Sequence, residues 1–264
     1  MATFWPVWHW MYGRVVDTSG DAWELLSLAT AAVFLVLAKT DARATGMPAG
    51  LTHALGGQRA NCASLPIVLL LIYAATYQFL PPLLRAGIAV TAIAAACSAI
   101  WFDKRMDLPL LGLMLLSLPV IASLNFYLGY PLRVVVGTAT QALLQMNGFA
   151  VVREGTLLHW GGRLISIDAP CSGIKMLWAG LYLSFTLAAF SRLDSRRTIL
   201  LGAIAIAAIL LANVLRAAAL FFVEADVVVL ANEWHTGIGV IVFLFAALGV
   251  ASAAHRLRVV TYAA

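Results

Sequence analysis

The apolar residues of this chain gather in long runs separated by short polar segments, a pattern typical of membrane-spanning helices. A helix needs about 20 mostly apolar residues to cross the hydrocarbon core of a bilayer. We identify seven such runs, at 22–38, 62–80, 84–102, 108–128, 171–191, 198–222 and 236–254. The pattern predicts an all-α polytopic membrane protein, a bundle of about seven to eight transmembrane helices.

The segment 131–148 interrupts this pattern because it carries Arg133, Gln141 and Gln145 among apolar residues. It is too polar for a helix that faces lipid along its whole length, so we predict an amphipathic or re-entrant helix, with an eighth span still open. We therefore expect one integral membrane domain over 1–264. It would comprise N-terminal spans (1–130), an external amphipathic helix with a hairpin (131–170) and catalytic spans (171–264).

Composition supports the membrane assignment. Charged residues make up 11% of the chain and hydrophobic residues 62%, whereas soluble domains carry roughly 25% charged residues. The net charge of +5 is better explained by membrane topology than by a nucleic-acid partner. The aromatic cluster Phe4–Tyr12 predicts an interfacial anchor rather than a signal peptide.

The basic residues predict an orientation. With the N-terminus outside, the cytoplasmic segments would hold ten basic residues and the external ones five, as the positive-inside rule requires. This places the C-terminus in the cytoplasm. The cytoplasmic set is Lys39, Arg43, Arg59, Lys104, Arg105, Arg192, Arg196, Arg197, Arg256 and Arg258, and the external set is Arg14, Arg85, Arg133, Arg153 and Arg163.

An external β-hairpin is predicted just before the fifth span. The segment Leu157–Ile167 reads as two short strands around Gly161 and Gly162. It leads directly towards Cys171 and could serve as a lid over a site or as a plain connector; the sequence leaves both open.

Three polar residues stand at the ends of apolar runs: Cys171, Arg216 and His235. Each lies about 20 residues from a basic residue at the other end of its run, a distance of about 30 Å along a helix. We therefore predict that all three lie at similar depth on the external side of the membrane.

A thiol at this position is suited to nucleophilic chemistry. Pro170 fits the first turn of a helix, and a thiolate there is stabilised by the helix dipole, so the pKa of Cys171 should be lowered. Gly173 removes a side chain next to the sulfur. The alternative is that Cys171 is a small buried residue, as Cys62 and Cys97 are expected to be.

The neighbouring polar residues suggest supporting roles. Asn213 shares a helix face with Arg216, which could bind a substrate carboxylate or an oxyanion, or else extend to the interface. His235 could act as a general base or be an interfacial histidine beside Trp234. Lys175 could lower the thiol pKa or extend towards water.

The ordered set Pro170-Cys171-Ser172-Gly173-Ile174, Asn213-Val214-Leu215-Arg216 and His235 resembles the exosortase/archaeosortase family of prokaryotic membrane proteins. The resemblance covers roughly 130–255. Members are regarded as cysteine transpeptidases, which implies that Cys171 is the nucleophile and that Arg216 and His235 complete the catalytic set. Histidine at the third position implies the bacterial type.

The resemblance also implies a setting. Substrates would be secreted proteins with a C-terminal sorting signal of the PEP-CTERM kind: a short motif, one membrane helix and a basic tail. The protein would lie in the bacterial inner membrane with its site facing the periplasm. No metal or organic cofactor is implied. The alternatives are a transporter, or a factor in exopolysaccharide export without chemistry of its own.

Overall fold

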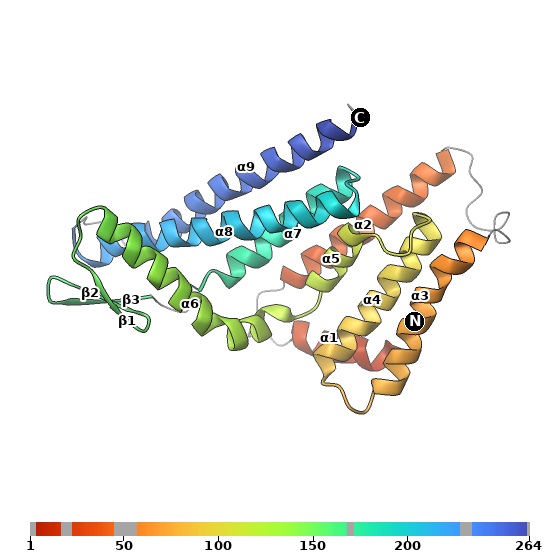
Figure 1. Ribbon diagram of the computed structural model, residues 1–264. Helices are drawn as coiled ribbons and strands as arrows, with labels where there is room; N and C mark the ends of the chain where they lie inside the picture. Colours follow the sequence, from red (N-terminus) through yellow and green to blue (C-terminus); the bar gives the residue numbers. More distant parts are fainter. Residues whose placement is uncertain (1–3, 17–22, 45–56, 168–171, 228–233, 263–264) are drawn as a thin grey trace. The chain divides into compact units, whose positions relative to one another are not determined.

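The computed structural model describes residues 4–16, 23–44, 57–167, 172–227 and 234–262 (Figure 1). The helices are α1 (Trp5–Val16), α2 (Trp23–Ala44), α3 (Gly57–Thr76), α4 (Pro82–Trp101), α5 (Leu108–Leu116), α6 (Val120–Met146), α7 (Ile174–Phe190), α8 (Ser195–Glu224) and α9 (Trp234–Tyr262). The strands are β1 (Val152–Glu154), β2 (Leu157–Trp160) and β3 (Arg163–Ser166).

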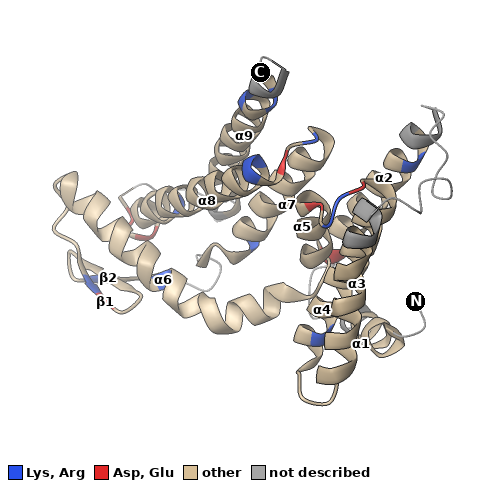
Figure 2. Ribbon diagram, turned by 45° about the vertical axis from the view of Figure 1, so that its right-hand side comes forward, with Lys and Arg blue, Asp and Glu red and all other residues tan. Residues whose placement is uncertain are grey.

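Within the described residues, five helices are long and apolar enough to cross a membrane. They are the segments Trp23–Thr40, Pro82–Trp101, Val120–Met146, Ser195–Glu224 and Thr236–Val259. Two shorter apolar helices, Cys62–Thr76 and Ile174–Phe190, accompany them. Charged residues lie mainly at helix ends and in the connecting segments (Figure 2). The prediction of an all-α polytopic membrane protein is confirmed.

Two predicted segments have different boundaries in the structure. The run 108–128, predicted as one span, is divided into α5 and the first part of α6, with the break at Ser117–Pro119. Proline lacks an N–H and its ring clashes with the preceding turn, so the first helix ends before Pro119. The segment 131–148 is not a separate helix, because α6 continues through Pro131 to Met146.

The polar residues of α6 are used within the protein. Gln145 donates a hydrogen bond of 2.8 Å to the backbone carbonyl of Val151, and Thr140 is fully buried. Side chains that contact protein do not oppose membrane insertion as lipid-facing ones do, so the polarity of 131–148 does not exclude it from a membrane-spanning helix.

By its internal contacts the described chain divides into two compact units. The first comprises Met1–Val120 and Phe185–Thr198, and the second comprises Ile121–Ser184 and Ile199–Ala264. In the first unit, α4 presents small residues such as Ala86, Ala94 and Ala95, all fully buried, to its neighbours. A buried hydrogen bond of 2.7 Å from Ser27 Oγ to the carbonyl of Leu113 ties α2 to α5.

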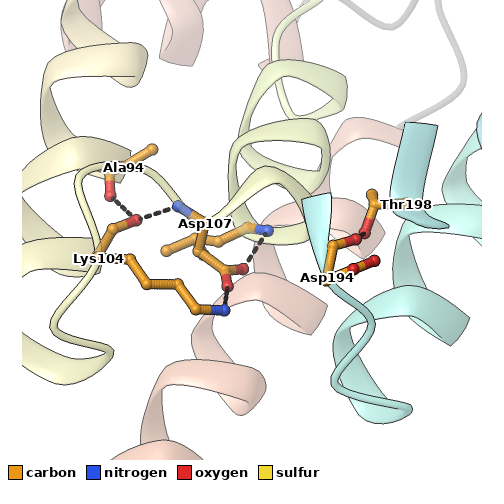
Figure 3. Close-up of polar contacts among 7 residues, drawn as sticks. Ala94, Lys104, Asp107, Asp194 and Thr198 are labelled. Atoms are coloured by element: carbon orange, nitrogen blue, oxygen red, sulfur yellow. Dashed lines mark hydrogen bonds and ion pairs between the residues drawn. The ribbon is translucent and has the colours of Figure 1, made fainter. Parts of the chain in front are cut away.

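The start of α5 is fixed by a polar network around Asp107 (Figure 3). Asp107 caps the helix by accepting the Leu110 N–H at 3.2 Å, and its own N–H donates to Ser98 Oγ at 2.9 Å. Ser98 in turn donates to the Ala94 carbonyl at 2.7 Å, and Lys104 Nζ lies 3.2 Å from the Asp107 carboxylate. A capping aspartate satisfies a backbone donor that the first helical turn otherwise leaves unpaired.

The start of α8 is capped in the same way. Asp194 Oδ1 accepts the backbone N–H of Arg197 at 2.9 Å. The hydroxyl of Thr198 donates to the carbonyl of Asp194 at 2.8 Å (Figure 3). The Asp107 network joins the end of α4 to the start of α5. The Asp194 cap fixes the start of α8 shortly after the end of α7.

Close helix packing in the first unit gives a stability prediction. A methyl group at Gly112 would lie 2.5 Å from the Phe185 ring, whereas one at Gly87 would meet nothing within 4 Å. We expect Gly112→Ala to lower the free energy of unfolding by about 1–3 kcal/mol through overpacking. Gly87→Ala should leave it unchanged or raise it, because alanine favours helix.

Thermal unfolding of the detergent-solubilised chain measures both effects. Adding Phe185→Ala to Gly112→Ala should recover part of the lost unfolding temperature, since the smaller side chain makes room for the methyl group. Equal unfolding temperatures for Gly112→Ala and Gly87→Ala would contradict the close contact between α5 and α7.

The second unit contains an antiparallel sheet in the order β1-β2-β3. The register pairs Trp160 with Arg163, so Gly161 and Gly162 form the turn, with φ of 56° and 78°. Positive φ at both central positions is the reason for two glycines in a tight hairpin. The predicted hairpin is confirmed, while β1, paired with β2 from Val152 to Glu154, was not predicted.

The sheet packs on helices of the same unit. Leu158 and Ile165 form a buried apolar cluster with Leu144 of α6 and Phe221 of α8. Trp160 packs against Phe221 with ring centroids 5.7 Å apart. The hairpin is therefore anchored to the C-terminal part of α8 rather than being a loose connection.

Candidate active site

The predicted nucleophile, Cys171, lies outside the described residues, which resume at Ser172. Ser172 is buried, with 4% of its surface exposed. Gly173 follows with a φ of 75°, a conformation that glycine adopts without strain. The helix α7 begins at Ile174, after the left-handed Gly173. Cys171 therefore precedes the helix by three positions, and the prediction that it lies in the first turn is wrong.

Asn213 of α8 lies directly against the backbone of Gly173. A methyl group at position 173 would lie 2.7 Å from Asn213 Nδ2 and 2.8 Å from its Cγ. Asn213 itself is 1% exposed. The positive φ and this contact both require glycine, so the residue two positions after Cys171 fixes where α8 passes the start of α7.

Arg216 lies one helical turn beyond Asn213 and contacts the start of α9. A methyl group at Gly239 would lie 3.1 Å from Arg216 Nε and 3.5 Å from its Cζ. The guanidinium end of Arg216 therefore lies beside the α9 backbone, and its Nε is shielded from solvent. An arginine held against a neighbouring helix is expected where it faces a bundle interior.

His235 is the second residue of α9. It lies four positions, about one turn, before Gly239 on the same helix. Its side chain lies outside what the structure describes. The backbone thus brings position 235 within one turn of the point where Arg216 contacts α9.

The structure consequently brings the starts of α7 and α9 against one turn of α8 in the second unit. The start of α7 and the start of α9 both contact α8, at Asn213 and Arg216 respectively, and these residues are one turn apart. Close packing at Gly180, where a methyl group would lie 2.5 Å from Ile209 Cγ1, brings α7 and α8 together deeper in the unit. The described parts of the predicted site therefore share one end of this unit.

The remaining predicted residues differ in their surroundings. Lys175, the second residue of α7, is exposed, as expected for a side chain extending towards water or towards a ligand. Gly239 was not singled out from the sequence. A glycine one turn after a candidate histidine, in Trp234-His235-Thr236-Gly237-Ile238-Gly239, is the signal that could have identified it.

The hairpin also contacts the segment that leads to His235. Arg163 of β3 forms an ion pair with Asp226, which has a φ of 54° just beyond the end of α8. Both side chains are at least half exposed, so the pair adds little to stability. The pair holds the C-terminal end of α8 against the sheet. Whether the hairpin covers the site stays a prediction.

These features define a class of protein: a polytopic α-helical membrane protein with an arginine, a buried asparagine and two close-packed glycines where the starts of two helices meet a third. The family model of the transmembrane exosortases (Exosortase_EpsH) matches residues 2–252, nearly the whole chain. The chain therefore belongs to the transmembrane exosortase family. No curated protein and no solved structure matches it.

Proposed function

We propose that this chain is a membrane cysteine endopeptidase or transpeptidase that cleaves C-terminal sorting signals of secreted proteins. The observation that carries the proposal is the meeting of the starts of α7 and α9 with one turn of α8. Contacts at Gly173 and Gly239 put Asn213 and Arg216 of α8 beside the starts of the two helices that follow Cys171 and contain His235. A nucleophile, a base and a cation from these positions form the set that acyl transfer requires.

In the proposed reaction, His235 takes the proton of the Cys171 thiol, and the sulfur attacks the scissile carbonyl carbon. Arg216 stabilises the negative oxygen of the tetrahedral intermediate. Collapse breaks the C–N bond, and the leaving amine takes the proton from His235. The secreted part stays attached as a thioester to Cys171. An amine then displaces the sulfur to form a new amide, or water does so to form a carboxylic acid, and the thiol is regenerated.

We further propose that the site faces the periplasm and the C-terminus the cytoplasm. The division of the predicted fourth span does not alter this expectation. Helix α5 has nine residues, about 14 Å, too short to cross the bilayer, and α6 has 27. One crossing between α4 and the hairpin is therefore retained. Arg192, Arg196 and Arg256 then fall on the cytoplasmic side, as the positive-inside rule favours.

Labelling of Cys171 in intact cells tests this proposal. Cys62 and Cys97 are replaced by alanine, and a membrane-impermeant maleimide is added from outside at a series of pH values. A thiolate that shortly precedes the N-terminus of α7 should react with a midpoint well below about 8.5, the value for a free thiol. We expect rapid external labelling with this lowered midpoint.

Two results would count against the proposal. Labelling only after permeabilisation would reverse the orientation and remove the site from the periplasm. External labelling with an ordinary thiol midpoint would leave the orientation standing but favour a transporter or a non-catalytic export factor. A Cys171→Ser chain serves as the control for background labelling.

A further inference from the structure

The first unit contains a cleft that the proposed reaction does not use. It has a volume of about 620 Å³ and is lined from α2, the end of α4, the turn before α5 and the end of α7. All its lining residues belong to this unit. The volume is in the range of sites that bind small molecules.

The floor of this cleft is aromatic and apolar. Phe34 of α2 stacks on Phe102 with ring centroids 5.2 Å apart, and meets Phe190 edge-on at 6.2 Å. Trp101 and Phe190 also line the cleft, and Phe190 is 49% exposed. These rings join the middle of α2 to the ends of α4 and α7, and they present an apolar surface to whatever occupies the space.

The polar lining of the cleft carries a surplus of positive charge. It consists of Lys104 and Arg192, both exposed, and the carboxylate of Asp107. The Asp107 side chain is 6% exposed and already accepts the Leu110 N–H and the Lys104 ammonium (Figure 3). The carboxylate is thus engaged in the fold, and the net charge offered to an occupant is positive.

Two non-glycine residues at the cleft have positive φ, a backbone conformation more usual for glycine. Arg192 has a φ of 51° and closes α7, its N–H donating to the Ala189 carbonyl and that of Leu193 to the Ala188 carbonyl. Asp103, next to Lys104, has a φ of 53°. Glycine is the usual residue at such helix ends. Non-glycine residues in this conformation persist where a side chain has a role, and here Arg192 lines the cleft.

We propose that this cleft binds an anionic phospholipid, with the headgroup phosphate between Lys104 and Arg192 and the apolar part against the phenylalanine rings. Basic pockets between membrane helices are sites for anionic headgroups, and an amphiphile matches a lining that is cationic at one part and aromatic at another. The proposed orientation puts the cleft in the cytoplasmic leaflet. The binding itself does not depend on the proposed reaction.

Native mass spectrometry of the full chain in non-ionic detergent tests this inference. The chain carries Cys171→Ala, so that thiol chemistry has no influence on the outcome. Dioleoylphosphatidylglycerol and dioleoylphosphatidylcholine are titrated separately, because they share acyl chains and differ in headgroup charge. We expect one molecule of the anionic lipid to be retained more tightly than the zwitterionic one.

Charge variants locate the binding. Each cation removed should weaken retention of the anionic lipid by roughly fivefold, so the double variant Lys104→Gln with Arg192→Gln should lose roughly 25-fold. A charge-matched control, Arg196→Gln with Arg256→Gln, removes two basic residues that do not line the cleft. Its affinity should stay within about twofold of the parent. An equal loss in both doubles would show only general attraction and would overturn the proposal.

A steric variant keeps the test valid if the charge variant fails to fold. Ala38 lines the cleft and is partly buried, so Ala38→Trp fills the space without changing charge. Unchanged affinity in this variant would overturn the cleft as the site. Glycerol 3-phosphate is the competitor without acyl chains. If it displaces the lipid at equal concentration, a free anion is the occupant and the lipid assignment is wrong.

Discussion

Replacing Cys171 with alanine is expected to abolish cleavage of the sorting signal while the chain still accumulates in the membrane. A nucleophile has no substitute in a mechanism that passes through a thioester, and losing one lowers the rate by on the order of 10⁴-fold or more. Pulse-chase analysis of a secreted reporter with a C-terminal signal would show the uncleaved form alone. The small change in volume at a helix start should leave the unfolding temperature nearly unchanged.

The other two cysteines supply the matched control. Cys62 is buried and Cys97 partly buried, both in helices of the first unit. The double variant Cys62→Ala with Cys97→Ala should retain the wild-type cleavage rate. Cleavage at that rate by Cys171→Ala would exclude the thiol as nucleophile and leave a transporter or an export factor as the better explanation of the site.

The sequence predicted the helices well because apolar runs of span length are a strong and local signal. The runs at 84–102 and 198–222 correspond closely to α4 and α8. The hairpin was equally local, since Gly161 and Gly162 supply the positive φ that its turn requires. Strand β1 was missed because three residues are too short for a periodic pattern, and only pairing with β2 identifies it.

The error at 131–148 has a different cause. Polarity was counted along the chain, whereas what matters is the surface that each side chain faces. Gln145 donates to the Val151 carbonyl and Thr140 is fully buried, so both side chains are engaged within the protein. A count of polar residues records neither the burial of Thr140 nor the bond of Gln145 to a carbonyl six residues away, and 131–148 was therefore separated from the apolar run before it.

The candidate site shows the same division between local and tertiary information. Asn213 and Arg216 stood out because polar residues are rare within apolar runs. The contacts that they make across helices, with Gly173 and Gly239, are visible only in three dimensions, since each is defined by a side chain from α8. The roles of Cys171, Arg216 and His235 stay predictions that the variants described here address.

Arg216 provides the second large expected effect. We expect Arg216→Ala to lower the cleavage rate by about 10²–10³-fold, the usual loss for one donor to a developing oxyanion. Arg216→Lys keeps the charge but loses the planar fork of donors, so it should recover little of this rate. Both rates are measured with the same secreted reporter, and the unfolding temperature of each variant is recorded alongside.

A variant at Gly239 distinguishes an effect on catalysis from an effect on folding. A methyl group there would lie 3.1 Å from Arg216 Nε, so Gly239→Ala should displace the guanidinium by a few tenths of an ångström. Because alanine favours helix over glycine, the unfolding temperature should hold or rise while cleavage slows, by about tenfold if geometry governs the rate.

Gly249→Ala is the matched control on the same helix, because a methyl group at position 249 would meet nothing within 4 Å. It should match wild type in cleavage and gain the same stability from helix propensity. A Gly239→Ala chain that cleaves as fast as the Gly249→Ala chain would show that the position of Arg216 does not limit the reaction. Full activity in Arg216→Ala would exclude the residue from the catalytic set. Slow cleavage by Gly239→Ala with unchanged stability would identify the start of α9 as the element that positions the arginine for chemistry.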